Sequence, residues 1–269
     1  MNNIIIPNTN LRCSKFIFGT GSLLNILNKK KRLYLLDNAV NLGFTHFDTS
    51  PYYGFGLAEE NLGEVIKQNK NLTVTSKVCL YPPGKLNHNL IEMFLKKSFG
   101  KIIPKLSSPK IDFTIEYAKK SIDGSLKKLN IDCIDILLIH EPIIDLLNID
   151  EWRYFLENLV KIGKIKYFGI SSLNSSRIKK FLNIKTKLFN IIQTLDSIDL
   201  NEADFILDNN LPFQITHGYI SSLKKRQPKT LLKDVFNKII NRNSKGAIII
   251  STTKEKNLNE IVNLLKKND

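Results

Sequence analysis

Short apolar runs recur along the chain and alternate with longer stretches in which apolar residues return every three or four positions. Several runs, such as IDILLIH and GAIIIS, are apolar almost without interruption, which is typical of strands buried on both faces of a parallel sheet. The runs predict strands at 16–20, 45–49, 72–78, 134–140, 166–171, 190–194, 213–216 and 247–251.

The stretches between these runs have the spacing of amphipathic helices, with apolar side chains gathered on one face. Gly43 and Gly163 occupy positions typical of helix C-caps, and Asn174 and Asn257 occupy positions typical of N-caps. The segment after the seventh strand is expected to run into a single helix. The predicted helices are 31–42, 60–68, 118–129, 152–162, 175–182, 202–208, 234–241 and 258–267.

Eight strands alternating with eight helices indicate an α/β fold, the (β/α)8 TIM barrel, and we expect residues 1–269 to form it as a single domain. A doubly wound sheet would carry Gly-x-Gly-x-x-Gly after the first strand, and GTGSLL lacks the third glycine. The segment 80–112 is an insertion after strand 3, and we expect it to lie at the barrel mouth and border the pocket. Because the sequence stops just after the eighth helix, we expect no C-terminal lid loop. The apolar insertion residues expected to face the pocket are Ile91, Phe94, Leu95 and Phe99.

Composition narrows the class of protein. Apolar residues make up 42% and charged residues 24% of the chain, and no apolar run approaches the roughly 20 residues that span a bilayer, so a cytoplasmic globular protein is expected. The net charge of +15 comes from 34 Lys and only 6 Arg, scattered without interleaved aromatics, which favours a solvated surface over a nucleic-acid face. The three cysteines are far apart, and no cluster has metal-ligand spacing, so neither a disulfide framework nor a metal site is expected.

Polar residues that could perform chemistry follow three of the predicted strands. Asp48, Lys77 and His140 stand at strand ends, and Tyr53 lies in the loop after Asp48. In a TIM barrel these ends meet at one mouth. A lysine ammonium lowers the pKa of a nearby tyrosine, and a neutral histidine can hold a carbonyl oxygen beside the tyrosine hydroxyl. This combination predicts a carbonyl site with Tyr53 as general acid.

Other polar and aromatic residues have simpler interpretations. His46 lies within the second strand and is expected to be packed, as is Trp152 on an apolar helix face. Glu141, next to His140, is expected on the rim of the site and not as a second acid.

The stretch GFTHFDTSPYYGFGLAEENLG (43–63) resembles the aldo-keto reductase signature G-x-x-x-F-D-T-A-x-x-Y-G-x-G-x-x-E-x-x-L-G. The resemblance continues in VTSKV, DILLIHEP, KIKYFGISSLN, IIQ and IIISTTKEKNLNEIV, and thus covers nearly the whole chain in order. The insertion and the segment after it are most similar to the bacterial aldose and galactose dehydrogenase-like branch. The resemblance implies a catalytic tetrad formed by Asp48, Tyr53, Lys77 and His140.

The resemblance also implies a nicotinamide coenzyme bound without a Rossmann fold. Ser171, Ser172 and Gln193 fall where the family holds the carboxamide, and Thr20 and Gly21 fall beside the nicotinamide ribose. Asp48 is also implied as a residue that binds the coenzyme. The usual Lys and Arg around the 2′-phosphate are missing, and Lys254 and Lys256 are their candidate replacements. NADP(H) is therefore only slightly favoured, and NAD(H) stays open. The residues implied around this end of the coenzyme are Ser251, Thr252, Thr253, Lys254, Asn257 and Glu260.

The expected function is therefore that of an oxidoreductase that moves a hydride between a nicotinamide coenzyme and a small-molecule carbonyl or alcohol, such as a sugar or another bulky aldehyde or ketone. The residue that stacks on the nicotinamide stays open between His217 and Tyr219. The altered phosphate-binding residues keep one alternative open, a catalytically weak barrel that senses the coenzyme or regulates a partner.

Overall fold

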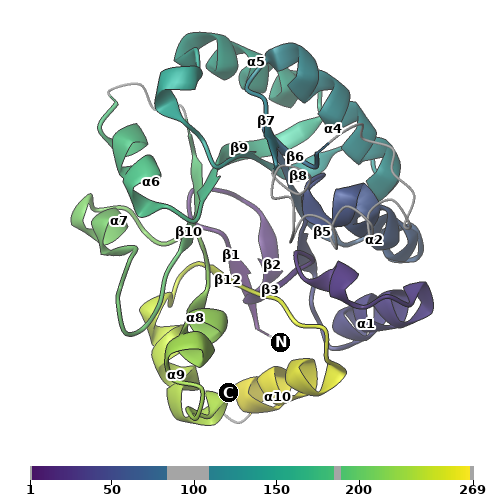
Figure 1. The fold of residues 1–269 in the computed structure, drawn as a ribbon, viewed down its shortest axis with the longest axis vertical. Coiled ribbons are helices and arrows are strands. Elements are labelled where there is room, and N and C mark those ends of the chain that lie inside the picture. Colours follow the sequence, from purple (N-terminus) through teal and green to yellow (C-terminus); the bar gives the residue numbers. More distant parts are fainter. Residues whose placement is uncertain (1, 84–108, 185–188, 267–269) are drawn as a thin grey trace.

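The computed structural model describes residues 2–83, 109–184 and 189–266, and its centre is a closed barrel of eight parallel strands (Figure 1). The last strand of the barrel pairs with the first, so that the sheet has no free edge. The predicted (β/α)8 barrel and the place of all eight predicted strands are confirmed. In the order of the chain the barrel strands are β3 (Phe16–Gly19), β4 (His46–Asp48), β5 (Thr73–Val78), β8 (Ile134–His140), β9 (Ile165–Ser172), β10 (Ile191–Leu195), β11 (Ile215–His217) and β12 (Ala247–Ile250).

Helices surround the barrel, and each of the eight predicted helices is present (Figure 1). Gly43 and Gly163 have φ angles of 92° and 75° just after α1 and α5, and the Asn174 side chain accepts a hydrogen bond at the start of α6, as their predicted cap positions require. The described helices are α1 (Lys29–Asn41), α2 (Leu57–Gln68), α4 (Ile115–Leu129), α5 (Ile149–Lys161), α6 (Ser175–Leu182), α7 (Asp204–Asp208), α8 (Tyr219–Arg226), α9 (Leu232–Arg242) and α10 (Glu255–Lys266).

Two predictions about helices are wrong. The segment after the seventh strand forms two helices, α8 and α9, because Tyr219 and Leu223 are one turn apart in α8 and both are buried. Asn257 is not an N-cap, since α10 begins at Glu255. The turn before α10 is held by Thr252, whose Oγ1 accepts hydrogen bonds from the Lys254 N–H and from Asn257 Nδ2.

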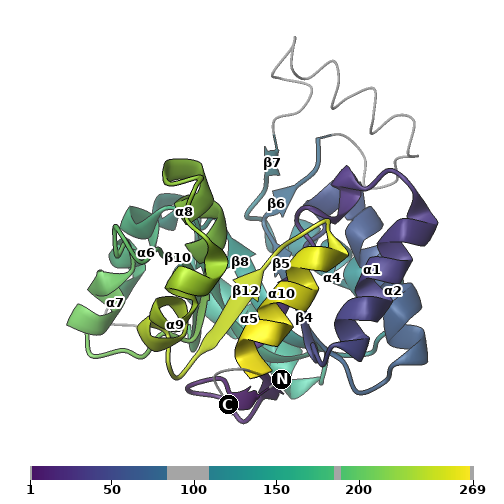
Figure 2. The same cartoon turned by 90° about the horizontal axis from the view of Figure 1, so that it is seen from below.

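The core has an outer layer between strands and helices and an inner layer within the barrel. Phe16 and Phe18 pack outward against α9 and neighbouring strands, whereas Ile17 between them points into the barrel. This alternation follows the two-residue period of a strand. At the N-terminal end a hairpin of β1 (Asn3–Ile5) and β2 (Arg12–Ser14) closes the barrel, so the opening that can hold a ligand is at the opposite end (Figure 2).

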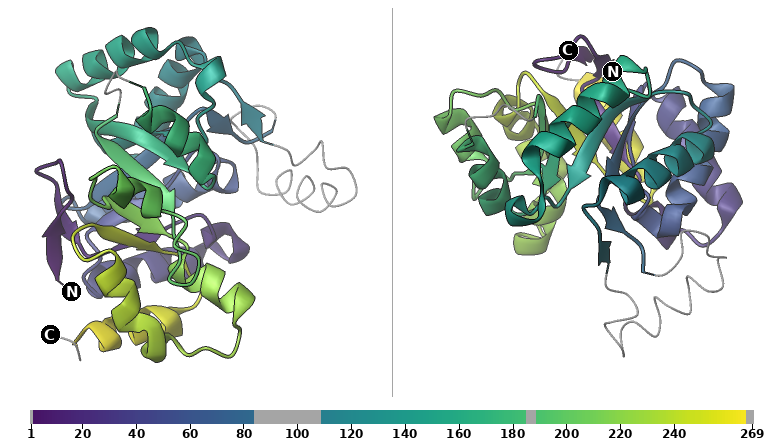
Figure 3. Two further views of the ribbon diagram at one scale, coloured as in Figure 1. Left: turned by 90° about the vertical axis from the view of Figure 1, so that its left-hand side faces the viewer. Right: turned by 90° about the horizontal axis from the view of Figure 1, so that it is seen from above.

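The insertion begins and ends as a short antiparallel hairpin, β6 (Leu80–Tyr81) with β7 (Lys110–Ile111), and this hairpin rises from the C-terminal end of the barrel (Figures 2 and 3). The Tyr81 ring packs on Tyr117 of α4, with 4.6 Å between ring centroids. Four residues expected to face the pocket lie outside the described residues: Ile91, Phe94, Leu95 and Phe99. No helix in the described ranges has the length and apolar character needed to cross a membrane.

Candidate active site

Asp48 and Lys77 form a buried ion pair at the ends of the neighbouring strands β4 and β5. The Lys77 Nζ donates to both Asp48 carboxylate oxygens at 2.7 Å and to the Thr49 carbonyl oxygen at 3.0 Å. The two side chains are only 1% and 5% exposed. Burial alone would lower the Lys77 pKa, but Asp48 and Tyr53 more than offset it and hold this pKa above its usual value. The ammonium is therefore charged at neutral pH.

Tyr53 lies directly above this pair, with the Lys77 Nζ 4.9 Å from its ring centroid. Burial raises the pKa of the Tyr53 hydroxyl, and Lys77 opposes it by its charge and by hydrogen bonding. The expected lowering by Lys77 is thus present, but burial is larger and the net shift is upward. The hydroxyl therefore keeps its proton at neutral pH.

A left-handed turn fixes the position of Tyr53. The short 3-10 segment Tyr53–Gly56 contains three successive residues with positive φ, at 57°, 60° and 86° for Gly54, Phe55 and Gly56. A Cβ atom on Gly54 would lie 2.2 Å from Leu24 Cγ. The turn can therefore bring Tyr53 against the barrel only with glycine at this position, which explains the Tyr-Gly-x-Gly pattern physically.

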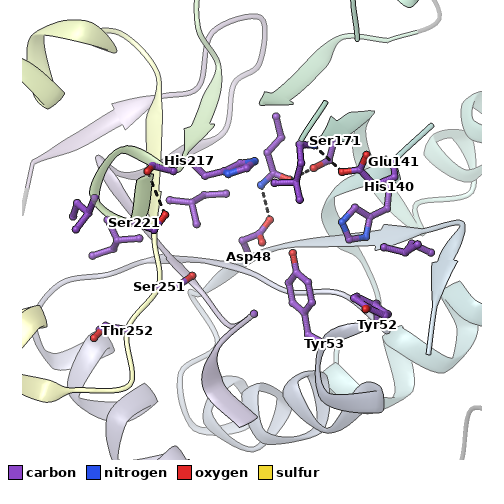
Figure 4. Close-up of a pocket in the computed structure, with 18 of the residues that line it drawn as sticks. Asp48, Tyr52, Tyr53, His140, Glu141, Ser171, His217, Ser221, Ser251 and Thr252 are labelled. Carbon is purple, nitrogen blue, oxygen red and sulfur yellow. Dashed lines mark hydrogen bonds between the residues drawn. The ribbon is translucent and has the colours of Figure 1, made fainter. Parts of the chain in front are cut away.

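His140, the last residue of β8, lies beside Tyr53 at the base of the opening (Figure 4). The two rings meet edge to face, with centroids 6.1 Å apart. Burial lowers the pKa of His140 well below its usual value, and the nearby Lys77 and His217 lower it further, so the imidazole is neutral. Its Nδ1 atom is buried and makes no hydrogen bond to the described residues, and the His140 ring lines the opening.

A hydrogen-bond network extends from the ion pair to the next strands. Gln193 Nε2 donates to Asp48 Oδ2 at 2.7 Å, and Ser171 Oγ donates to Gln193 Oε1 at 2.6 Å. Thr20 supports the other side, because its Oγ1 donates to the Asp48 carbonyl oxygen at 3.1 Å. The neighbouring Ser172 faces away and donates to the Glu141 carboxylate at 2.7 Å.

These side chains surround a cavity of about 750 Å³ at the C-terminal ends of the strands (Figure 4). Of the residues expected at a coenzyme, those that line the cavity are Gly21, Asp48, Ser171, Gln193, Ser251, Thr252, Asn257 and Glu260. The others are not among its lining residues: Thr20, Ser172, Thr253 and Lys254. The expected nicotinamide end and the expected far end of the coenzyme site therefore both contribute residues to the cavity lining.

The two aromatic residues that could stack on the nicotinamide occupy different environments. His217 lines the cavity, and burial lowers its pKa to about 4, with smaller effects of Asp48 and Lys77. Tyr219, the first residue of α8, is buried in the core, where its hydroxyl donates to Asp196 Oδ2 at 2.8 Å. Of the two, only His217 can contact a ligand in the cavity.

Several lining residues come from the insertion, where the sequence predicted a border of the pocket, and others come from segments that carry no motif. Leu80, Pro109 and Ile111 of the insertion border the cavity, so its described part lies where the insertion was expected. Leu173 and Arg177 form another side, and Ile220, Ser221 and Lys224 come from the unexpected helix α8. No motif identifies them, because the folding of their loops brings them to the mouth.

His46, Trp152 and Glu141, which were expected to have no role in the chemistry, lie where the sequence predicted. His46 is fully buried, and its two ring nitrogens bond Thr73 Oγ1 and Thr75 Oγ1 at 2.7 and 2.8 Å. Trp152 packs against Phe155, and its Nε1 donates to the Phe113 carbonyl oxygen. Glu141 lies on the cavity rim. In the described ranges no three His, Cys, Asp or Glu side chains come together as a metal site requires.

The closed parallel barrel, with polar residues gathered at its mouth, defines a TIM-barrel protein. Residues 15–195 match the model of the aldo/keto reductase family, which is more than half of the chain. The chain therefore belongs to the aldo/keto reductase family.

The relatives of this chain include sugar dehydrogenases. L-galactose dehydrogenase of Arabidopsis thaliana is 30% identical over 177 residues, which cover 62% of this chain and 47% of that protein. D-threo-aldose 1-dehydrogenase of a Pseudomonas species is 28% identical over 167 residues, covering 60% and 49%. An aldo-keto reductase of Schizosaccharomyces pombe whose name specifies NADP(+) is 31% identical over 152 residues, covering 54% and 38%. The chain thus spans about half the length, or less, of these curated relatives.

Solved structures support the fold. An aldo-keto reductase of Bacillus halodurans, determined in its holo form, aligns with a TM-score of 0.74 over 99% of this chain and 91% of that chain, at 21% identity. The glycerol dehydrogenase of Gluconobacter oxydans aligns with a TM-score of 0.73 over 97% and 89%, at 16% identity. Both share the barrel over nearly the full chain.

Proposed function

We propose that this protein is a nicotinamide-dependent oxidoreductase that interconverts a carbonyl compound and its alcohol, with Tyr53 as the general acid and base. The observation that supports this most is the buried Asp48–Lys77 pair beneath Tyr53, with neutral His140 beside it. In the direction of reduction, the Tyr53 hydroxyl and a ring N–H of His140 would both donate to the carbonyl oxygen. Two donors on one oxygen stabilise the negative charge that develops there.

The protonation states suit this role. Burial keeps the Tyr53 hydroxyl protonated, so it can donate a proton to the oxygen of the carbonyl group as reduction proceeds. The phenolate that remains would be stabilised by Lys77, which Asp48 holds in its charged form. In the direction of oxidation the reverse step starts from the Tyr53 phenolate, which Lys77 stabilises and which accepts the proton of the alcohol.

A coenzyme fits the residues present at the nicotinamide end. Ser171 and Gln193 carry the hydroxyl and amide that would hold the carboxamide, and His217 offers the aromatic face beside them. A bound nicotinamide supplies or accepts the hydride. Gly21, Ser251, Thr252, Asn257 and Glu260 would contact the remainder of the coenzyme.

NADP(H) is favoured as the coenzyme, with NAD(H) as the alternative. The name of the Schizosaccharomyces pombe relative specifies NADP(+), which supports this choice. Within the chain, Lys254 and Lys256 are exposed cations next to the cavity segment 251–252 and could attract the 2′-phosphate as point charges.

The substrate is proposed to be a sugar or another bulky aldehyde or ketone. The relatives named L-galactose dehydrogenase and D-threo-aldose 1-dehydrogenase support a sugar. Leu80, Pro109 and Ile111 of the insertion form an apolar border of the cavity.

The test is oxidation of NADPH and of NADH by the purified protein with a panel of aldehydes, ketones and aldoses, and the reverse reaction with the matching alcohols. The expected result is turnover by wild type and its loss in Tyr53→Phe, while both proteins bind the coenzyme in a thermal-shift assay. Coenzyme binding without turnover of any compound would support the alternative, a barrel that senses the coenzyme. Turnover that survives in Tyr53→Phe would contradict the assigned proton donor.

A further inference from the structure

Arg177 forms part of the cavity wall near His140 but has no part in the chemistry proposed above. It lies in the first turn of α6, just after β9, and lines the cavity together with Glu141 and Leu173. Its Nη1 donates to the Glu141 carbonyl oxygen at 3.0 Å and to Glu141 Oε2 at 3.1 Å. The guanidinium is therefore held in one place at the rim.

Glu141 is arranged to hold this arginine and has little capacity left for a ligand. Its backbone is left-handed, with φ of 51°, and its N–H donates to the Ser171 carbonyl oxygen at 2.7 Å. Its carboxylate accepts from the Leu173 N–H and from Ser172 Oγ, both at 2.7 Å, in addition to Arg177. Because its oxygens are already occupied by protein donors, Glu141 acts as the counter-ion that orients Arg177.

Arg177 keeps unused donors. Both of its hydrogen bonds come from Nη1, and in the described part of the chain Nε and Nη2 make none. Its side chain is 33% exposed, whereas that of Glu141 is 16% exposed. A planar guanidinium with free N–H groups is suited to a bidentate contact with a carboxylate.

The position of the pair ties it to the reacting end of the cavity. Glu141 lies beside His140 and on the same side as Tyr53, whereas Ser251 and Thr252 lie on the opposite side (Figure 4). The charge of Glu141 also acts on Tyr53. A group bound by Arg177 would therefore belong to the carbonyl compound and not to the far end of a coenzyme.

We infer that Arg177 is a specificity-determining residue that binds a carboxylate on the substrate, so that the preferred substrate is a carbonyl compound carrying an acid group, such as a sugar acid. This inference rests on the proposed oxidoreductase function and narrows its substrate class. The net charge of +15 would attract any anion from solution, but only a local contact selects a carboxylate at this position.

A matched pair of substrates tests the contact. Para-carboxybenzaldehyde and para-carbamoylbenzaldehyde have nearly the same shape and differ in charge. We expect wild type to prefer the carboxylate in kcat/KM by about tenfold or more, the size of one charge-assisted contact. Arg177→Gln should bring this ratio to about one through KM, with kcat for the amide nearly unchanged.

Lys180→Gln is the control variant. It removes a positive charge from an exposed position of the same helix that does not line the cavity. We expect it to keep the preference of wild type. An equal fall of the ratio in both variants would assign the effect to the overall charge and overturn the inference.

The remaining outcomes are also decisive. A wild-type ratio near one overturns the inference without any variant, and reduction of the amide in that experiment leaves the proposed function intact. If Arg177→Gln keeps the preference for the carboxylate substrate, with coenzyme KM unchanged, another residue binds the carboxylate and the inference is overturned. Failure of wild type to reduce either aldehyde or the wider panel counts against the proposed function itself.

Discussion

The two ends of the cavity are built in different ways. At one end Asp48, Lys77 and His140 are buried at strand termini. Hydrogen bonds tie Asp48 to Lys77 and Gln193 on other strands, and the His140 ring contacts Tyr53. At the other end Ser251 and Glu260 are exposed and belong to a loop and to the outer helix α10. Thr252, between them, is occupied in local bonds to Lys254 and Asn257.

The comparison shows that electrostatic interactions are strongest at the buried end of the cavity. Burial strengthens the interaction between Asp48 and Lys77 and shifts the pKa values of Tyr53 and His140, because water does not screen these groups. A contact that exposed side chains such as Lys254 and Glu260 make with a ligand would be weak and sensitive to salt, because water screens it. We therefore expect large effects from changes at the buried end and small ones at the exposed end.

The largest effect is expected from Tyr53→Phe. The variant loses the proton donor and keeps the bulk of the ring, so kcat should fall by about 10² or more, which is typical of the loss of a general acid. Coenzyme affinity should change little, because the Gln193 and Ser171 contacts remain. Steady-state kinetics and a coenzyme titration measure the two quantities. Equal kcat values for variant and wild type would exclude this mechanism.

Lys77→Met should reduce activity about as much as Tyr53→Phe, because the lysine acts through the tyrosine. The double variant should then be little worse than either single one. If the two losses in log kcat add, Lys77 and Tyr53 work independently. Lys77→Met also leaves Asp48 buried with Gln193 as its remaining side-chain donor, so a thermal-unfolding control must show that the barrel is still folded.

Much of the buried end could be predicted from the sequence. Strands in a parallel barrel end at one mouth, so Asp48, Lys77 and His140 had to converge once their strands were recognised. The signature around Tyr53 was sufficient to add the fourth residue. The net pKa of Tyr53 could not be predicted, because it depends on how completely the ring is buried, and burial is a property of the whole fold.

The loops at the mouth were far less predictable. Whether Tyr219 faces the ligand or the core depends on Asp196, a buried carboxylate that also accepts from Arg242 Nε at 2.8 Å. The contact of Arg177 with the cavity rim depends on the left-handed backbone of Glu141. Such partners come from other elements, and the local pattern of apolar positions does not contain them.

Acid should destabilise the buried interior measurably. Burial lowers the pKa of His46 to about 4 and that of His217 to about 4, against 6.5 for an ordinary histidine. Between pH 4 and pH 6.5 each of these histidines is protonated in the unfolded chain but neutral in the folded protein. Its contribution to the free energy of unfolding is therefore complete above pH 6.5 and is lost as the pH falls toward 4. The loss between pH 7 and pH 5 should be about 2 kcal/mol for one such histidine.

Urea unfolding at pH 7 and pH 5 measures this loss. His46 is the histidine to vary, because it is not among the residues that line the cavity and its ring nitrogens bond Thr73 and Thr75. In His46→Gln the difference in unfolding free energy between the two pH values should be smaller than in wild type. His88 lies outside the described residues and is present in both proteins, so its contribution cancels. A pH difference that is the same in both proteins would show that His46 titrates normally.

The smallest effect is expected at the exposed end. Lys254→Gln removes a cation that makes no ion pair in the described structure and does not line the cavity, so it can act on a 2′-phosphate only through solvent. NADPH affinity should fall by about threefold at most, NADH affinity should stay the same, and added salt should remove the difference. Fluorescence titration with both coenzymes at low and high salt measures this, with Lys180→Gln as the control for net charge. A loss of NADPH affinity above about tenfold that persists in salt would mean that Lys254 makes a direct, desolvated contact. Both ends of the cavity would then contribute comparably to coenzyme binding. The difference between the buried and the exposed end would concern the chemical step and not binding.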